Sequence, residues 1–561
     1  MRIHTPHKRS VYIVVTLFLI SLSFLFPSCR TKRVRNAHKG GIINAKAEKF
    51  NESDVADELE KIFNVTSVDD SIWQKGKIFN ISQVMQKAYS EEEYYPIWLT
   101  DNGDTSYVAS LLQEINDTKF DGLDPDDYNA GKLRSMLNAY KSGKNISDDE
   151  VIRFDTLCTH SYLQASRDLL LGKIIPAKAD SLWFHANDSV WKPYISLAKM
   201  GSGKADYPTL DSFRSRQLTY KLLRNVLIKY SSLPNDSAYV GAKAAAASGM
   251  LTDSVKDIIM RSELPWDASA DDSIKNFQKI LTADYQYYLA YTHSKGDSIV
   301  KASYAAPIDI IKEKIDVNME RLRWMKQNPE SLYVLVNVPL LQFFLRIDGN
   351  DAMNMQVVVG KTIRQTPSLN ANLANVVINP PWGVPPTIMK KDVLPGLLKS
   401  GQAYLSKKGL KVYDMKGNEV SPNRVTATNY KRFVFRQDPG DDNALGNVKF
   451  NLPNKWDIYL HDTPHREDFG KKDRFKSSGC IRLQKPRELA EFILSDLEGK
   501  YFTQGKLDTM IQTRKTRYEV LAKKIPVHII YLTAFEDSTH TRVHFIPDVY
   551  GRDPKLASLL K

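Results

Sequence analysis

Apolar residues recur at helical spacing through the first half of the chain. Between residues 56 and 205, amphipathic stretches alternate with turn sequences such as LTDNGD and FDGLDPDDY, and Phe154, Cys158 and Tyr162 fall on one face of a helix. Residues 206–320 keep the helical period, with AKAAAASG as a segment of small residues. The pattern predicts a helical domain over 56–205 and a second helical region over 206–320.

Beyond this half the period changes to that of short strands. SLYVLVNVPLLQFFLRIDG, MQVVVGK, KRFVFRQ and NVKFNLP are β-branched or aromatic and are separated by Gly and Pro. They predict a β-rich domain over 321–510, in which 383–432 mixes both signals and is expected to form a lid-like subdomain. A helix is expected between Pro486, at its first turn, and Gly499, just past its end.

Residues 511–561 are expected to add a C-terminal helix and a strand pair that pack on this domain. The predicted fold class is therefore α+β, a mostly α-helical N-terminal region followed by a β-rich domain.

The extreme N-terminus indicates export. Arg2, Lys8 and Arg9 precede an apolar run over residues 11–26. This run fits the core of a signal peptide better than a membrane span, which needs about 20 residues. We therefore expect an exported protein.

The end of the signal resembles a bacterial lipoprotein signal, because small Ser28 stands directly before Cys29. We expect residues 1–28 to be a signal peptide, Cys29 to be lipidated, and 29–55, rich in Lys, Arg and Asn, to be a tether. The expected location is the periplasm, with a membrane anchor through the lipid. Ordinary signal cleavage and an uncleaved anchor are the alternatives.

The charge balance is basic, with a formal net charge of +13 and a pI of about 9.2. A basic balance is compatible with nucleic acid, an anionic membrane or an acidic polymer as partner. The sequence shows neither zinc-finger spacing nor basic runs interleaved with aromatics. We expect a solvated basic surface and no nucleic-acid partner.

Three cysteines occur in 561 residues, too few for a disulfide framework. Cys158 belongs to the helical pattern described above and is expected to pack as a small apolar residue. Cys480 lies in the glycine turn RFKSSGCIRLQKP, outside any periodic pattern. A lone thiol in such a turn of an exported protein is a candidate nucleophile.

A nucleophilic thiol needs a base, because its ordinary pKa near 8.5 leaves it mostly protonated at neutral pH. The stretch WDIYLHDTP is expected to form a strand whose side chains alternate between two faces, with Trp456, Ile458 and Leu460 on one and Asp457, Tyr459 and His461 on the other. The strand then presents Tyr459 and His461 together.

Two further features favour thiolate chemistry at Cys480. Cations surround the cysteine in sequence: Lys471, Lys472, Arg474, Lys476 and Arg482. Gly479 permits a tight turn, so that nearby amide N–H groups can face a developing oxyanion, and Tyr459 can add a hydroxyl. Thiolate, imidazole and oxyanion donors together imply acyl transfer through a thioester, to water or to an amine.

Plainer interpretations exist for the histidines. His461 alone is also typical of an ordinary strand end. His461 and His465, with Asp462, have a spacing that suggests zinc, but Pro464 breaks the helix on which such a pair would converge. We therefore expect no metal.

The stretch HDTPHREDFGKKDRFKSSGCIRL resembles the signature of L,D-transpeptidases with a YkuD-type catalytic domain. His461 matches the base, Cys480 the nucleophile, and Gly479 and Arg482 their positions in that signature. Ser478 departs from it, since the family usually has histidine there. Ser-Ser-Gly-Cys is similar to the larger, YcbB-like branch of the family.

The resemblance to this branch extends along the chain. VNMERLRW, VVVGKTIRQTP, NPPWGVP and RQDPGDDNALGNVKFNLPN are similar to its catalytic half, and PIWLTDNG, DGLDPDDY and LLLGKIIP to its helical scaffold domain. A peptidoglycan-binding module usually lies between them. Only DDSIKNFQ is recognisable here, so the module within 206–320 is expected to be degenerate.

The resemblance implies an enzyme that cross-links peptidoglycan without a cofactor. Cys480 attacks the third residue of a tetrapeptide donor stem, and the acyl group passes to the side-chain amine of a diaminopimelate-containing acceptor stem, giving a 3→3 cross-link. His461 is the implied base, and the amides of Gly479 and Cys480 hold the oxyanion together with Tyr459. Carbapenem-type β-lactams are the implied covalent inhibitors.

The substrate-binding residues implied by the same resemblance are Arg482, Ser478, Asn443 and Trp382. Turn and core roles are at least as plausible for the last two. Two alternatives remain at this point: an L,D-carboxypeptidase or related hydrolase that uses the same thiol, and a lipid-anchored wall-binding scaffold with a vestigial site.

Overall fold

The structure is a computed structural model that describes residues 49–64, 80–143, 146–185, 187, 189–231, 238, 241–242, 245, 252–254, 308–536, 540–541 and 543–561. The expected signal peptide, Cys29, most of the tether and most of 206–320 lie outside the described residues. Within the described part, no helix combines the length and the apolar character needed to cross a membrane.

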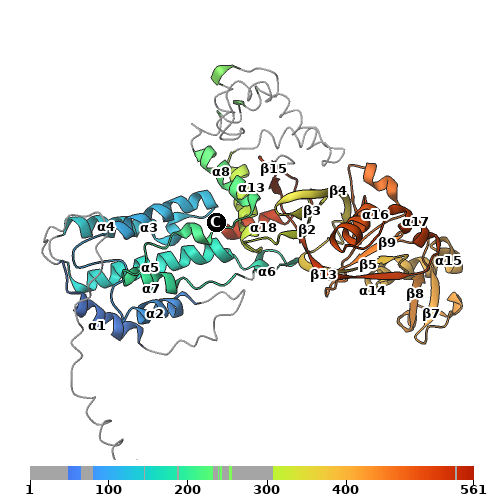
Figure 1. The fold of residues 1–561 in the computed structure, drawn as a ribbon, viewed down its shortest axis with the longest axis horizontal. Helices are drawn as coiled ribbons and strands as arrows, with labels where there is room; N and C mark the ends of the chain where they lie inside the picture. Colours follow the sequence, from blue (N-terminus) through green and yellow to red (C-terminus); the bar gives the residue numbers. More distant parts are fainter. Residues whose placement is uncertain are drawn as a thin grey trace, which may run out of the picture.

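The N-terminal half is a bundle of helices, seen on the left of Figure 1. The helices are α1 (Glu52–Phe63), α2 (Ile81–Glu91), α3 (Ser106–Asp117), α4 (Ala130–Ser142), α5 (Asp148–Leu171) and α7 (Tyr194–Gly201), while the short α6 (Pro176–Ala179) packs with the sheet domain. α5 carries the predicted apolar face, with Phe154, Cys158 and Tyr162 buried, and its first turn is closed by a capping box between Ser147 and Glu150.

The expected tether is too long at its C-terminal end. Phe50 already packs in the core of the helical bundle, and the side chain of Asn51 caps α1, which begins at Glu52. The ammonium of Lys49 donates to the carbonyl of Tyr140 at 2.6 Å. The folded scaffold therefore begins by residue 49.

The second half is built on one large mixed sheet. Its strands are β1 (Trp183–Phe184), β2 (Leu332–Asn337), β3 (Gln342–Ile347), β4 (Asn350–Gly360), β5 (Ser368–Ile378), β9 (Val448–Asn451), β10 (Leu460–His461), β11 (Phe475–Ser477), β12 (Ile481–Leu483) and β13 (Arg517–Ile530). The order is β1-β5-β13-β2-β3-β4-β12-β10-β9, β11 adds to β4, and β9 also pairs with β5. The last pairing closes the sheet on itself, which removes its exposed edges there.

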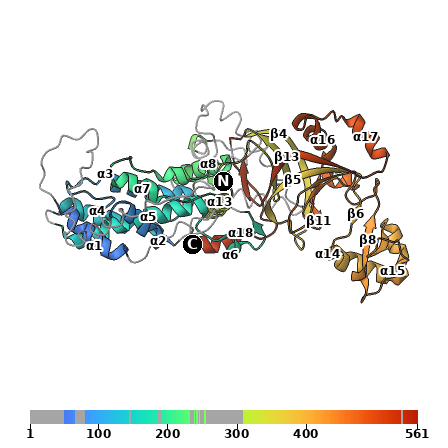
Figure 2. The same ribbon diagram turned by 60° about the horizontal axis from the view of Figure 1, so that its bottom comes forward.

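Helices cover this sheet, as Figures 1 and 2 show. They are α8 (Leu218–Ser231), α13 (Ile308–Arg323), α16 (Pro486–Glu491), α17 (Gln504–Gln512) and α18 (Asp553–Leu560). α16 begins at Pro486 as predicted and continues as a π-helical turn to Leu497. Side chains of α8 and α13, such as Leu223 and Ile315, belong to the core of the sheet domain rather than to that of the scaffold.

A small subdomain stands off the far end of the sheet, away from the scaffold (Figure 2). It holds β6 (Trp382–Gly383), α14 (Pro386–Ile388), α15 (Leu394–Lys407), β7 (Lys411–Asp414) and β8 (Phe433–Gln437). β6, β8 and β7 form a sheet of their own over a separate small core. This is the part expected to be lid-like, and we call residues 382–437 the lid.

The C-terminal segment is more central than expected. β13 does not pack on the outside of the domain but runs inside the main sheet, between β5 and β2. β14 (Ala534–Glu536) and β15 (Val543–Phe545) form the separate strand pair. The alternation in PVHIIYLTAF identified a strand, but its neighbours are distant in sequence and could not be read from it.

A buried polar network joins scaffold and sheet domain. Arg323 at the end of α13 is fully buried, pairs with Glu320 at 2.7 Å and donates to the backbone carbonyl of Asp121 at 2.7 Å. The other carboxylate oxygen of Glu320 accepts from the backbone N–H of Ile174 at 2.7 Å. Gly172 is required beside it, because its φ is +88° and an added Cβ would lie 2.7 Å from that oxygen.

Replacing Arg323 with methionine is expected to destabilise the protein by about 3–5 kcal/mol, because Glu320 is then a buried charge without its partner. Chemical denaturation followed by circular dichroism measures the change. Arg153→Met is the matched control, since this arginine is 69% exposed and lies 4.0 Å from Asp149; a change within about 0.5 kcal/mol is expected there. Equal midpoints for Arg323→Met and the wild type would contradict the assigned role of the network.

Candidate active site

Strand register places three polar side chains on one face of the sheet. β10 pairs with β12 in parallel, so that His461 faces Arg482, and pairs with β9 in the antiparallel sense, so that His461 also faces Lys449. Side chains at facing positions of neighbouring strands point to the same side. Lys449, His461 and Arg482 therefore form a row across three strands.

Tyr459 and Cys480 lie on the same face as this row, two residues before His461 and Arg482. The N–H of Ile481 donates to the carbonyl of Tyr459 at 3.1 Å, which holds the two segments side by side just before β10 and β12 begin. The Tyr459 ring stands edge-on to His461, with ring centres 5.5 Å apart. Burial raises the pKa of the Tyr459 hydroxyl, and the neighbouring Cys480 thiol raises it further. Thiol, phenol and imidazole thus lie together, as the sequence predicted for Tyr459 and His461.

The predicted strand is shorter than expected. Asp457 has a φ of +54°, in the left-handed region, and only Leu460 and His461 have strand geometry. Asn454 holds the preceding turn, because its side-chain oxygen accepts from the N–H groups of Trp456 and Ile458. A local side-chain cap of this kind competes with strand pairing.

The turn that carries the thiol is fixed by hydroxyl groups. Gly479 has a φ of +121°, which favours glycine, and its carbonyl accepts from the hydroxyl of Thr366 at 2.8 Å. The Ser477 hydroxyl donates to the carbonyl of Cys480 at 2.6 Å and accepts from the N–H of Gly479 at 3.1 Å. The Gly479 N–H, which we expected in an oxyanion hole, is therefore engaged inside the turn. Among the described residues, the Cys480 N–H and the Tyr459 hydroxyl are candidates for that role.

The thiol is protonated in this state. Cys480 donates from Sγ to the carbonyl of Asp457 at 3.6 Å. Burial raises the pKa of the Cys480 thiol, while hydrogen bonds from Tyr459 and the charge of Lys449 act against that rise. The site consequently needs a base at the moment of reaction.

His461 can act as that base because it is neutral. Burial, followed by the charges of Arg482 and Lys449, lowers the pKa of His461 to about 3. Nδ1 of the ring is buried and without a hydrogen-bond partner, and no hydrogen bond joins His461 to Cys480 among the described residues. Such contacts commonly tighten only when substrate binds.

Most of the cations predicted around the thiol interact with other groups instead. Lys471, Lys476 and Arg482 converge on Asp468, at 2.8, 3.5 and 3.2 Å. Buried Arg474 donates to backbone carbonyls, including that of Val357. Of the predicted set, Arg482 is the residue whose charge interacts with Cys480.

The cation that the sequence reasoning missed is Lys449 of β9. Its charge lowers the pKa of Cys480, and it comes from a strand about 30 residues upstream. The alternation of buried Val448 and Phe450 around it, in NVKFNLP, was the available signal. Only the pairing of β9 with β10 reveals which residue Lys449 faces.

Ser478 links the catalytic turn to the lid. Its hydroxyl accepts from the guanidinium of Arg364 at 3.0 Å, and Arg364 also donates to Asp392 of the lid at 2.8 Å. Neither Arg364 nor Asp392 was identified from the sequence. We call Arg364, Asp392 and Ser478 the lid latch.

The two weaker candidates differ in position. Trp382 lies in β6 at the base of the lid, and its interaction with Tyr459 acts against the rise in the pKa of that residue. Asn443 is buried in a turn, where its amide donates to the carbonyl of Asp438 and its oxygen accepts from the N–H of Leu445. Asn443 thus shapes the loop before β9.

His465 does not join His461. Its side chain is 62% exposed and lies 3.5 Å from Glu467, whereas His461 is buried. Among the described residues, no group of three His, Cys, Asp or Glu side chains is placed to hold a metal ion.

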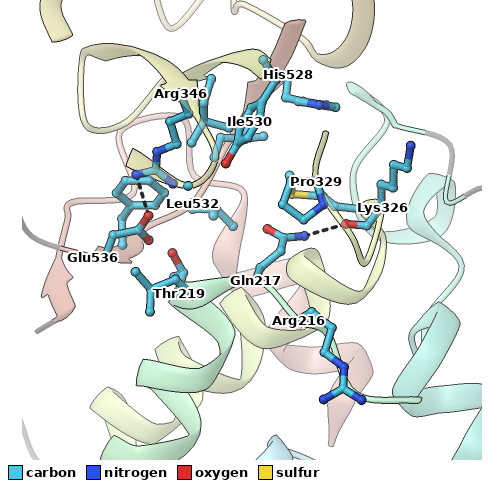
Figure 3. A pocket seen from close by; sticks show the side chains of 16 residues that line it. Arg216, Gln217, Thr219, Lys326, Pro329, Arg346, His528, Ile530, Leu532 and Glu536 are labelled. Carbon is cyan, nitrogen blue, oxygen red and sulfur yellow. Dashed lines mark hydrogen bonds and ion pairs between the residues drawn. The ribbon is translucent and has the colours of Figure 1, made fainter. Parts of the chain in front are cut away.

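A cavity of about 200 Å³ opens elsewhere, where the start of α8 meets the main sheet (Figure 3). Gln217, Arg346, His528 and Glu536 are among the side chains that line it, and Arg346 pairs with Glu536 at 2.8 Å. None of the side chains around Cys480 reaches this cavity.

Comparison with known proteins agrees with the two halves of the fold. Residues 331–527 match the family model of the L,D-transpeptidase catalytic domain, and residues 83–227 match that of a scaffold domain. A curated protein of Haemophilus influenzae named "Putative L,D-transpeptidase" is 33% identical over 249 residues, which cover 44% of this chain and 49% of that protein. The chain thus spans about half the length of the curated relative that it matches.

Proposed function

Because residues 331–527 match the L,D-transpeptidase catalytic domain and residues 83–227 match a scaffold domain, we propose that the chain forms 3→3 cross-links between the stem peptides of peptidoglycan. The observation that supports this most is the row of Cys480, Tyr459 and His461 on one face of the sheet. A thiol, a neutral imidazole and a phenol hydroxyl are the groups that acyl transfer through a thioester requires.

In the proposed first half-reaction, Cys480 attacks the carbonyl of the third residue of a tetrapeptide stem. His461 takes the thiol proton, Sγ bonds to the carbonyl carbon, and the Cys480 N–H and Tyr459 hydroxyl bind the oxyanion. The amide bond to the fourth residue then breaks, and His461 returns the proton to the departing D-alanine amine. The product is a thioester on Cys480.

In the second half-reaction, an amine replaces the thiolate. His461 removes a proton from the side-chain amine of a diaminopimelate-containing acceptor, the new amide bond forms, and the thioester breaks. The proton passes to Sγ, which restores the starting state. Arg482, held by Asp468 beside this row, is suited to a substrate carboxylate.

Incubation with purified tetrapeptide muropeptides, followed by mass spectrometry, tests the proposed function. A tetrapeptide–tripeptide dimer with a 3→3 linkage is the expected product. Tripeptide without dimer, in the presence of excess acceptor, would assign a hydrolase instead. Unchanged substrate would favour a wall-binding scaffold with a vestigial site.

The lid latch is expected to influence what fraction of the thioester reacts with water instead of with the acceptor amine. Arg364→Gln removes the contacts that hold the lid to the turn of Cys480, and we expect water to gain access to the thioester. The ratio of tripeptide to dimer should therefore rise about two- to fivefold, which corresponds to the free energy of a partly exposed ion pair. Chromatography of the products measures the ratio.

The matched control for the latch is Lys411→Gln, which removes an ion pair at 2.8 Å between Lys411 of the lid and Asp438, the residue that follows the lid. Its product ratio should equal that of the wild type. An unchanged ratio in Arg364→Gln would show that the latch does not govern water access.

We further propose that the chain works in the periplasm as a lipoprotein anchored through Cys29. The basic N-terminus, the apolar run and the Ser28–Cys29 junction support this. Metabolic labelling with a fatty-acid analogue, lost in Cys29→Ala, tests the anchor. Carbapenems are proposed as covalent inhibitors that acylate Cys480.

A further inference from the structure

Lys449 approaches the thiol from the strand next to His461. Val448 and Phe450 on either side of it are fully buried, so Lys449 points to the opposite face of β9, where it faces His461. Its ammonium nitrogen lies 4.2 Å from the centre of the Tyr459 ring. The hydroxyl of the same ring interacts with the Cys480 thiol, which, after burial, raises the pKa of Tyr459. Tyr459 thus contacts Lys449 through the face of its ring and interacts with the thiol through its hydroxyl.

The contact between Lys449 and Tyr459 restrains a flexible side chain. An ammonium over an aromatic face is attracted to the ring electrostatically, most strongly where water is excluded. Lys449 is partly buried, so its charge is screened less than that of a surface lysine. The lysine is therefore held in place rather than free in solvent.

The charged and titratable groups that face the thiol come from several elements: Lys449 on β9, Asp457 and Tyr459 before β10, His461 on β10, Arg482 on β12 and, behind it, Asp468. Arg482 is paired with Asp468 at 3.2 Å. Within the part of the chain that the structure describes, Lys449 has no ion pair within 4 Å. Lys449 is thus the cation in this set whose charge is least compensated.

We propose that Lys449 is a positioning residue for the thiol, whose ammonium stabilises the Cys480 thiolate. Its part in turnover rests on the proposed function, but its effect on the thiol can be measured without turnover. No bond to Lys449 forms or breaks. When His461 takes the thiol proton, Lys449 attracts the new charge on Sγ and repels the imidazolium, which favours release of that proton to the leaving amine.

The pH dependence of Cys480 alkylation by iodoacetamide, in the full-length protein and followed by mass spectrometry of the Cys480 peptide, tests this proposal. Lys449→Met keeps the aliphatic stem on the Tyr459 ring and removes the charge. The midpoint of the profile should move up by about one pH unit, so that alkylation at pH 7.5 slows about tenfold. Lys449→Arg should restore most of the rate.

The matched control is Lys455→Met. Lys455 also lies over an aromatic ring, with its ammonium 4.5 Å from the centre of Trp456, but is exposed and does not face the thiol. Its profile should coincide with that of the wild type. Buried Cys158, unreactive while the scaffold is folded, reports in the same digest that each variant remains native.

A profile of Lys449→Met that coincides with the wild type, or an equal shift in Lys455→Met, would overturn the proposal. The proposed function fails separately. If the midpoint shifts in Lys449→Met but the wild type forms no dimer, Lys449 stabilises the thiolate and the proposed transpeptidase activity is wrong. If the wild type forms dimers but the midpoint does not shift, the proposed activity is supported and the role of Lys449 is wrong.

Discussion

Cys480→Ala is expected to abolish cross-link formation, with a loss of roughly 10⁴–10⁶-fold in the rate of dimer production. The alanine variant keeps the turn, because Gly479, Ser477 and Thr366 supply its hydrogen bonds. It lacks the atom that forms the thioester, so the remaining residues can bind substrate but cannot divide the reaction into two steps. Quantitative chromatography of muropeptide products measures the loss.

Cys158→Ala is the control for this variant. Cys158 is fully buried in α5, and burial raises the pKa of its thiol well above the ordinary value, so it has no route to substrate. Its removal should leave the rate unchanged within about twofold and cost about 1 kcal/mol of stability through a small cavity. Equal activity in Cys480→Ala and the wild type would exclude the thiol mechanism.

His461→Gln is expected to lower the rate about 10²–10⁴-fold, the usual contribution of a general base. Because the pKa of His461 is lowered to about 3, the ring of the free protein is neutral throughout the range from pH 5 to 8. The thiol, whose pKa is raised, loses its proton only at alkaline pH unless the base removes it. The expected wild-type kcat/KM therefore shows no inflection near pH 6.5 and still rises above neutral pH.

The control for His461→Gln is His465→Gln, which alters an exposed ring. Its profile should match the wild type. An inflection near pH 6.5 that disappears in His461→Gln would contradict a neutral, desolvated base and indicate a preformed thiolate–imidazolium pair.

Local signals in the sequence were sufficient for the α+β class and for the elements that carry the candidate site residues. Helical spacing identified α5, and the change to short strands identified the boundary between the halves, because both periods follow from the geometry of a single element. The glycine turn singled out Cys480, and alternation placed Tyr459 on the same side as His461. The α+β class is confirmed by the fold and by the family matches.

Such local signals do not show which residues meet when they are distant in the sequence. The place of β13 inside the sheet, the convergence of Lys471 on Asp468, and the meeting of Arg364 with Asp392 depend on partners brought together only by the fold. The N–H of Gly479 was assigned to the oxyanion hole because glycine turns often supply such donors, but the Ser477 hydroxyl already accepts from it. Competition between neighbouring groups for one donor is decided by side-chain geometry.

The central claim, a thioester on Cys480 formed with loss of D-alanine, is tested most directly by intact-protein mass spectrometry of wild-type protein quenched with acid during turnover of a tetrapeptide muropeptide. The account predicts an adduct equal to the tripeptide muropeptide less water, located on the Cys480 peptide and absent in Cys480→Ala. Product formation without any adduct on Cys480, or an adduct that still contains the fourth residue, would contradict it.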